Sequence, residues 1–292
     1  MRASFLLKAF WVSLFVVPLA ATLAWIAGGE ASSTLVLRLL FAATVVVEVG
    51  ALRQTIVTRR LFAKSDAGYL TWTLTSAFLL VRLVAEARLL TLTFNLVSAP
   101  HPIEQASAGI FFYVIWLRYL YTVSDVLFVG ALITTIKAYR GTGLKFEIIG
   151  RDYVYIALVW FMPLTTLVFR SQLGLAGITA SDPYILGYRL TAVFVGAAIA
   201  TLCLVVRRYV VQMGRGAVGR VWNSVAVAGI ARDMSFLALA VLGRNWGRAA
   251  AFGEQYLLWI FAACWLLAAL YQQALVPARR PVPAPEPAEA RT

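Results

Sequence analysis

Residues 69–94 read YLTWTLTSAFLLVRLVAEARLLTLTF, an apolar run that also carries two arginines and a glutamate. A helix needs about 20 mostly apolar residues to cross the roughly 30 Å hydrocarbon core of a bilayer, and this run exceeds that length. It also lacks the period-two alternation that is typical of a membrane β-strand. The run therefore predicts a transmembrane helix whose ionisable residues face a partner or a cavity rather than lipid.

Seven further runs of the same kind lie on both sides of this one. They cover residues 9–27, 35–57, 109–136, 153–169, 184–206, 221–242 and 255–275. Hydrophobic residues make up 61% of the chain and charged residues 13%, which is about half the charged fraction of a soluble domain. The sequence therefore predicts an all-α polytopic integral membrane protein with eight transmembrane helices within residues 1–275. Seven helices are the alternative, because residues 1–29 resemble a signal peptide that would be cleaved.

Basic residues set the predicted orientation. If the N-terminus is cytoplasmic, most of the 26 lysines and arginines fall on the cytoplasmic side. Examples are Arg59, Lys64, Lys137, Arg140 and Arg208. This positive-inside pattern predicts cytoplasmic N- and C-termini in a bacterial cytoplasmic (inner) membrane. It also explains the net charge of +13 without nucleic acid as a partner, because basic inner loops bind the anionic headgroups of membrane lipids.

The last segment, residues 276–292, reads VPARRPVPAPEPAEART. It is rich in proline and alanine and has almost no large apolar residue, which is typical of an extended, disordered chain. We therefore expect a disordered cytoplasmic tail. This tail and the cytoplasmic loops are the places where a protein partner would dock.

The two halves of the membrane domain, residues 1–140 and 141–275, share weak matches in the same order. Trp72 and Arg82 in the third predicted span match Trp222 and Arg232 in the seventh, and the two residues are ten apart in each case. Because each half has an even number of predicted spans, a duplication would give parallel repeats. Coincidence in a chain rich in these residue types is the competing explanation.

Ionisable residues gather near the predicted midplane of the second, third and fourth spans. In the third span, Thr75, Arg82 and Glu86 share one helical face. Arg82 and Glu86 are i,i+4 neighbours and can pair directly. A charge at the centre of a bilayer costs about 2.5–3.5 kcal/mol on insertion scales, so such side chains are expected to find partners.

The neighbouring spans add further charges at similar depths. Arg118 and Asp125 share a face of the fourth span, with Tyr121 beside it, and the second span contributes Glu48. We predict one buried polar cluster made of Glu48, Arg82, Glu86, Arg118 and Asp125. Two interpretations compete: a charge-neutral network that sets helix register, and a binding site for a polar ligand, an ion or a proton.

The seventh span holds a second set of charges. Arg232 and Asp233 are adjacent in sequence. They predict either a second midplane pair or a shorter span that ends in a loop. Together with Thr75 and Tyr121, they are secondary candidates for the polar site.

Motifs for catalysis and metal binding are missing from the sequence. His101 is the single histidine, which excludes bis-histidine haem ligation and histidine-rich metal sites. Cys203 and Cys264 fall within apolar runs and are interpreted as small buried hydrophobic residues. The sequence contains no DxxxD, HExxH or GxSxG pattern. We therefore expect no catalytic residue, no metal and no cofactor.

Three classes of function fit these observations to different degrees. A non-catalytic sensor, receptor-like protein or assembly factor fits best, because the chain has short loops and no soluble domain. The alternative is a carrier for a small or amphipathic solute, which would use the midplane charges in a water-accessible cavity. A membrane-embedded lipid-modifying enzyme comes last, because it would have to rely on Glu48, Glu86 or Asp125 alone for acid–base chemistry.

Overall fold

The computed structural model describes residues 2–97, 108–143, 147–168, 183–212, 216–237 and 247–275. Regular structure within these residues is α-helical throughout. The helices are α1 (Arg2–Arg59), α2 (Ala67–Val97), α3 (Ala108–Arg140), α4 (Gly150–Val168), α6 (Pro183–Gln212), α7 (Ala217–Leu237) and α8 (Gly247–Leu275). The predicted tail, residues 276–292, lies outside the described residues.

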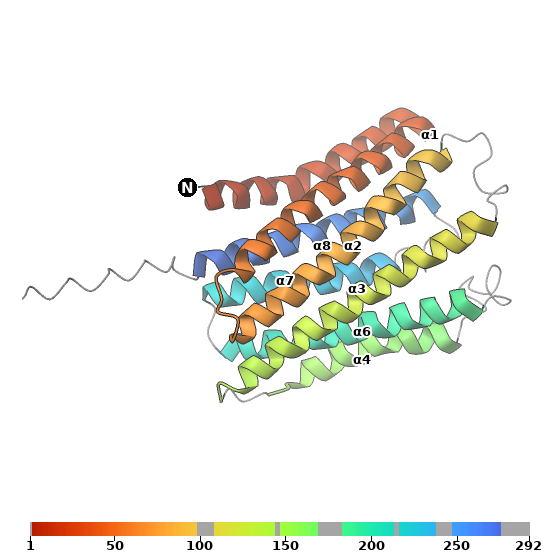
Figure 1. Cartoon of the computed structure of the whole chain (residues 1–292). Coiled ribbons are helices and arrows are strands. Elements are labelled where there is room, and N and C mark those ends of the chain that lie inside the picture. Colours follow the sequence, from red (N-terminus) through yellow and green to blue (C-terminus); the bar gives the residue numbers. More distant parts are fainter. Residues whose placement is uncertain are drawn as a thin grey trace, which may run out of the picture.

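Helix α1 contains both of the first two predicted spans. It is 58 residues long, which would make a straight helix of about 87 Å at 1.5 Å per residue. In Figure 1 it doubles back instead, so the N-terminus and the connection to α2 lie toward the same end of the bundle. Two spans can therefore belong to one helical element.

The helices lie side by side along one long direction (Figure 1). Their contacts close into a ring: α1 packs on α2, α2 on α3, α3 on α6, α6 on α7, α7 on α8, and α8 back on α1. Helix α4 packs on α6. Side chains that point into this ring from different helices can therefore meet.

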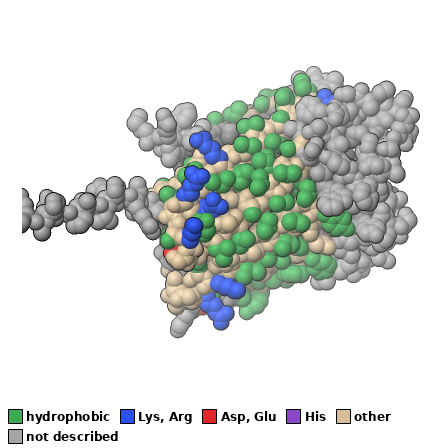
Figure 2. Space-filling model, viewed as in Figure 1, with side chains coloured by type: hydrophobic (Ala, Val, Ile, Leu, Met, Phe, Trp, Pro, Cys, Tyr) green, Lys and Arg blue, Asp and Glu red, His purple; other side chains and the backbone are tan. Residues whose placement is uncertain are grey.

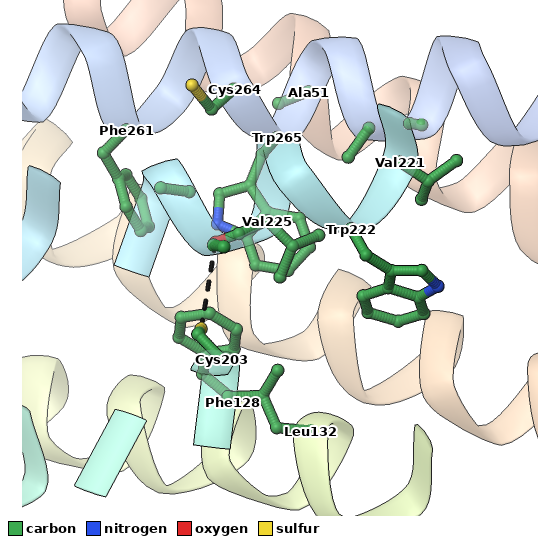
Figure 3. Close-up of a cluster of buried hydrophobic side chains, with 14 of the residues drawn as sticks. Ala51, Phe128, Leu132, Cys203, Val221, Trp222, Val225, Phe261, Cys264 and Trp265 are labelled. Atoms are coloured by element: carbon green, nitrogen blue, oxygen red, sulfur yellow. Dashed lines mark hydrogen bonds between the residues drawn. The ribbon is translucent and has the colours of Figure 1, made fainter. Parts of the chain in front are cut away.

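Aromatic side chains fill the middle of the ring. The rings of Phe78 on α2 and Phe128 on α3 stack with centroids 5.0 Å apart. Phe261 and Trp265 of α8 contact Phe78 at centroid distances of 5.8 and 5.4 Å. Figure 3 shows Phe128, Phe261 and Trp265 in this core, together with Cys203 and Val225. This core joins helices that are far apart in the sequence.

The outer surface of the bundle is apolar. Val46 is 71% exposed and Leu158 is 63% exposed, and hydrophobic side chains cover the middle of the face in Figure 2. Most of the visible lysine and arginine side chains gather toward the end where the N-terminus lies. Large apolar patches are rare on soluble monomers, so this surface is suited to lipid.

Within the part of the chain that the structure describes, five helical segments are long and apolar enough to cross a membrane. They are Leu35–Arg59, Ala67–Ala87, Tyr119–Arg140, Phe194–Gln212 and Phe252–Leu275. Together with the apolar outer surface, they confirm the prediction of a helical, multi-pass integral membrane protein. The number of spans and the internal repeat remain predictions.

A close approach between α6 and α7 gives a sharp test of this packing. A Cβ atom at Gly229 of α7 would lie 2.8 Å from Sγ of Cys203 on α6, closer than non-bonded atoms normally come. We expect Gly229→Ala to lower the free energy of unfolding by about 1–3 kcal/mol, because overpacking forces the helices apart. The measurement is unfolding of the purified protein in detergent.

The matched control for this substitution is Gly253→Ala on α8. A Cβ atom there meets nothing within 4 Å, so the change should raise stability by up to about 1 kcal/mol through helix propensity. Equal effects of the two substitutions would contradict the close α6–α7 packing.

Candidate functional site

Three almost completely buried ionisable side chains from two helices meet in the bundle core. Nε of Arg82 donates a hydrogen bond to Oε1 of Glu48 at 2.9 Å, and Nη2 of Arg82 donates to Oε1 of Glu86 at 2.6 Å. The Arg82 side chain is 4% exposed and both glutamates are 0% exposed. We call this group the Glu48–Arg82–Glu86 trio.

Glu48 can contact Arg82 because it belongs to a buried stripe of residues on α1. Thr44, Ala51, Thr55 and Thr58 are also fully buried, and they are spaced three or four residues apart, which returns to the same face of a helix. The hydroxyls of Thr44 and Thr55 donate to backbone carbonyls of their own helix. The stripe can therefore lie against neighbouring helices without leaving those hydroxyl groups unpaired.

Polar contacts nearer the end of α1 set its register against α2. The Ser76 hydroxyl on α2 donates to Oγ1 of Thr55 at 3.2 Å. Glu48 lies seven residues before Thr55, and Arg82 lies six residues after Ser76. Since consecutive helices run antiparallel, these similar spacings bring Glu48 to the level of Arg82.

Contacts with α8 hold the same end of α1. Nε2 of Gln273 donates to the backbone carbonyl of Gln54 and to Oγ1 of Thr58, both at 3.1 Å. Helix α1 is thus fixed between α2 and α8. The position of Glu48 on α1 is therefore fixed by contacts with both α2 and α8.

Aromatic rings enclose the guanidinium of the trio. Cζ of Arg82 lies 4.4 Å from the ring centroid of Phe261 on α8 and 5.4 Å from that of Tyr121 on α3. Both distances fall within the range of cation–π attraction. The trio therefore sits among four helices and is shielded from lipid and water.

A second ion pair joins α3 to α7. Nε of Arg232 donates to Oδ1 of Asp125 at 3.1 Å, and Nη2 of Arg232 donates to Oδ2 of the same carboxylate. A two-point arrangement of this kind is among the strongest that arginine makes. We call it the Asp125–Arg232 pair.

Asp233 lies beside this pair. A Cβ atom built at Gly196 of α6 would collide with Oδ1 of Asp233 and would lie 3.2 Å from Nη1 of Arg232. Because Gly196 has no side chain, the side chains of Asp233 and Arg232 can occupy the space beside it. Among the described residues, Nη1 of Arg232 is buried and has no hydrogen-bond partner.

The structure divides the predicted cluster between two places. Glu48, Arg82 and Glu86 come together, whereas the hydrogen bonds of Asp125 go to Arg232. The sequence predicts Arg232 instead either as a partner of Asp233 or as the mark of a shorter span. The Arg118 side chain lies outside the described residues. The repeated spacing of a tryptophan and an arginine on α2 and α7 could have indicated that Arg232 is buried like Arg82, but it does not name Asp125 as its partner.

Thr75 has a different environment from the charged residues. Its hydroxyl donates to the backbone carbonyl of Thr71 at 2.9 Å. It also lines a void of about 10 Å³ together with Trp72, Trp222 and Trp265. A void of this size holds about one water molecule, and the buried Nε1 of Trp265 has no partner among the described residues.

The chain matches no protein-family model, and neither the curated proteins nor the solved structures contain a match for it. Within the residues that the structure describes, no three histidine, cysteine, aspartate or glutamate side chains converge as a metal site would require. The polar groups that the structure describes offer acid–base and electrostatic chemistry.

A third ion pair lies at the beginning of α4. Arg208 of α6 donates to Oδ1 of Asp152, and Oδ2 of Asp152 accepts the backbone N–H of Ile149 at 3.0 Å. The hydrogen bond from Arg208 is the main cause that lowers the pKa of Asp152 below its ordinary value. This pair fastens α4 to the rest of the bundle.

The lowered pKa of Asp152 predicts a pH-dependent stability. In the unfolded chain an aspartate titrates at about 3.9, so the pair contributes stability above that pH and loses it as the pH falls through the lower folded pKa. We expect the thermal unfolding midpoint of the wild type to fall more between about pH 7 and about pH 3 than that of Asp152→Asn. Glu147→Gln, an exposed neighbour, is the control and should keep the wild-type pH dependence.

Proposed function

We propose that this protein is a non-catalytic sensor or assembly protein of the membrane that acts through a protein partner. The observation that carries the proposal is that each buried arginine of the two central groups donates hydrogen bonds to carboxylates of its own chain. A network of this kind holds helices in a defined arrangement. A protein partner would bind at the basic cytoplasmic loops or at residues 276–292, whose positions depend on that arrangement.

Among the described residues, the void beside Thr75 is too small for a solute, which fits this choice better than a carrier or an enzyme. Ligand pockets in proteins usually measure about 300–1,000 Å³, whereas the void beside Thr75 measures about 10 Å³. The aromatic core residues Phe78, Phe128 and Phe261 are themselves fully buried. These side chains leave no room for a solute in the part of the core that they fill.

The topology that goes with this proposal has eight spans and cytoplasmic termini in a bacterial inner membrane. It is supported by α1, which doubles back (Figure 1), and by the gathering of basic side chains toward one end (Figure 2). Trp72 and Trp222 line the same void, and each is followed ten residues later by a buried, paired arginine. This correspondence favours two parallel repeats, residues 1–140 and 141–275.

Native mass spectrometry tests the functional proposal. The protein is extracted gently from its own membrane as wild type, as Glu86→Gln and as the exposed control Glu147→Gln. We expect a protein partner at a fixed stoichiometry in all three samples and no small molecule that depends on Glu86. A small molecule that is lost in Glu86→Gln and kept in Glu147→Gln would overturn the proposal in favour of a carrier. A chain with neither partner nor ligand would also count against it.

Cysteine labelling in intact cells tests the topology. In a background without the native cysteines, Ser98→Cys and Ser181→Cys should react with an impermeant reagent from outside. Ser65→Cys and Thr142→Cys should react only after the membrane is opened. The reverse pattern would invert the orientation, and labelling of all four sites from outside would rule out the span assignment.

A further inference from the structure

The charges of the Glu48–Arg82–Glu86 trio do not balance. Two carboxyl groups share one guanidinium group, and all three side chains are almost completely buried. If both glutamates were ionised, the trio would carry a net charge of −1 in the interior of the bundle. An uncompensated buried charge is strongly unfavourable, and a buried carboxyl group usually takes up a proton instead.

Each glutamate of the trio also has one unused oxygen. Oε1 of each accepts from Arg82, whereas Oε2 of Glu48 and Oε2 of Glu86 are buried and have no hydrogen-bond donor among the described residues. Both carboxyl groups are bound to the same guanidinium group, which holds them side by side. A hydrogen bond between them requires a hydrogen on one of them, since two carboxylates are both acceptors.

Among the described side chains, which do not include that of Arg118, the neighbouring groups do not supply the missing positive charge. On α3, Tyr121 and Asp125 interact electrostatically with Arg82. The ring of Tyr121 faces the guanidinium and carries no positive charge. Asp125 is another acid, and it is already bound by Arg232. On α8, the group that faces Arg82 is the ring of Phe261. Arg82 is therefore the cation to which both glutamates are bound.

A proton suits this position better than a metal ion. Calcium takes six to eight oxygen ligands and magnesium requires six in a near-ideal octahedron. The trio offers two free oxygens, and aromatic rings fill the space around Arg82. One hydrogen between two oxygens needs no further ligand.

We propose that Glu48 and Glu86 share one bound proton at neutral pH, so that the trio is an electrically neutral proton-binding site in the membrane. The carboxyl group that carries the hydrogen donates it to the free oxygen of the other. The site is independent of the proposed partner, because the same charge count applies whether the protein is a sensor or a carrier. Loss of the shared proton would leave a net negative charge between α1 and α2 and so favour a different arrangement of these helices.

The trio makes an unusual prediction for single substitutions. In Glu48→Gln, the remaining Glu86 and Arg82 form a neutral pair, so Glu86 no longer needs a proton. In Glu86→Gln, the same holds for Glu48. Removal of either carboxyl group should therefore abolish protonation of the other one.

Infrared spectroscopy with isotope-labelled glutamate tests the proposal. The full-length protein is reconstituted at neutral pH with and without ¹³C in the glutamate carboxyl groups. The wild type should show a carbonyl band of a protonated carboxylic acid that shifts with the label and in heavy water. The control Glu147→Gln, which changes an exposed residue, should keep the band. Both Glu48→Gln and Glu86→Gln should lose it while remaining monodisperse.

Two results would overturn the shared proton. A wild-type protein without the labelled band has no protonated glutamate, and this result needs no variant to fold. A band that survives in either single variant would show that one carboxyl group holds a proton without the other. Neither result bears on whether a protein partner is present, so this proposal and the proposed function can fail separately.

Discussion

Arg82→Met should reduce the free energy of unfolding by about 3–5 kcal/mol, because it leaves two buried carboxyl groups without their cation. The guanidinium of Arg82 accounts for both charged hydrogen bonds of the trio and for two aromatic contacts. The matched control is Arg140→Met, which changes an exposed arginine at the end of α3 and should alter stability by less than about 0.5 kcal/mol. Unfolding of both variants in detergent checks the difference.

A compensating variant separates the charge of Arg82 from its packing. Glu48→Gln and Glu86→Gln, added to Arg82→Met, remove the two acids that the first change leaves unpaired. This triple variant should recover a large part of the lost stability, because removing a whole buried ionic group costs less than removing one partner. If the triple variant is as unstable as Arg82→Met alone, the packing of Arg82 rather than its charge holds the helices together.

Arg232→Met should have a similarly large effect, again about 3–5 kcal/mol, because it strips Asp125 of its paired donors. Adding Asp125→Asn should restore part of the loss. A double-mutant cycle between Asp125 and Arg232 should give a coupling free energy toward the upper end of the usual range of about 0.5–3 kcal/mol. The measurement is again unfolding in detergent, with each variant required to be monodisperse.

The same method decides whether the buried charges act as one group or two. The hydrogen bonds of Asp125 go to Arg232 and not to Arg82, although Asp125 lies within electrostatic reach of Arg82. The coupling between Asp125 and Arg82 should therefore be smaller than that between Asp125 and Arg232. Equal couplings would favour the single cluster that the sequence predicts.

The polar residues of the interior show where sequence reasoning is effective in a membrane protein. Arg82 and Glu86 are four residues apart on one helix, so their contact follows from the geometry of a single α-helix. The burial of Glu48 follows from the cost of exposing a charge to lipid. These inferences need no knowledge of how the helices pack.

The partners of Asp125 illustrate what sequence reasoning could not supply. Counting along the predicted spans placed Asp125 near the depth of Arg82 and Glu48, and depth alone allowed a single cluster. In the structure α7 packs between α6 and α8, and Arg232 reaches Asp125 across the ring. The depth of a residue follows from its place in a span, but its neighbours depend on the order of helices around the bundle.

The sequence by itself determined that this chain is a helical, multi-pass membrane protein, because the length and apolarity of a span are properties of one segment in contact with lipid. It also determined the i,i+4 neighbours Arg82 and Glu86. Only the tertiary structure decided that Glu48 completes a trio with them and that Asp125 belongs with Arg232. The rotation of each helix about its axis and its neighbours in the ring are set by side-chain packing between segments far apart in the chain.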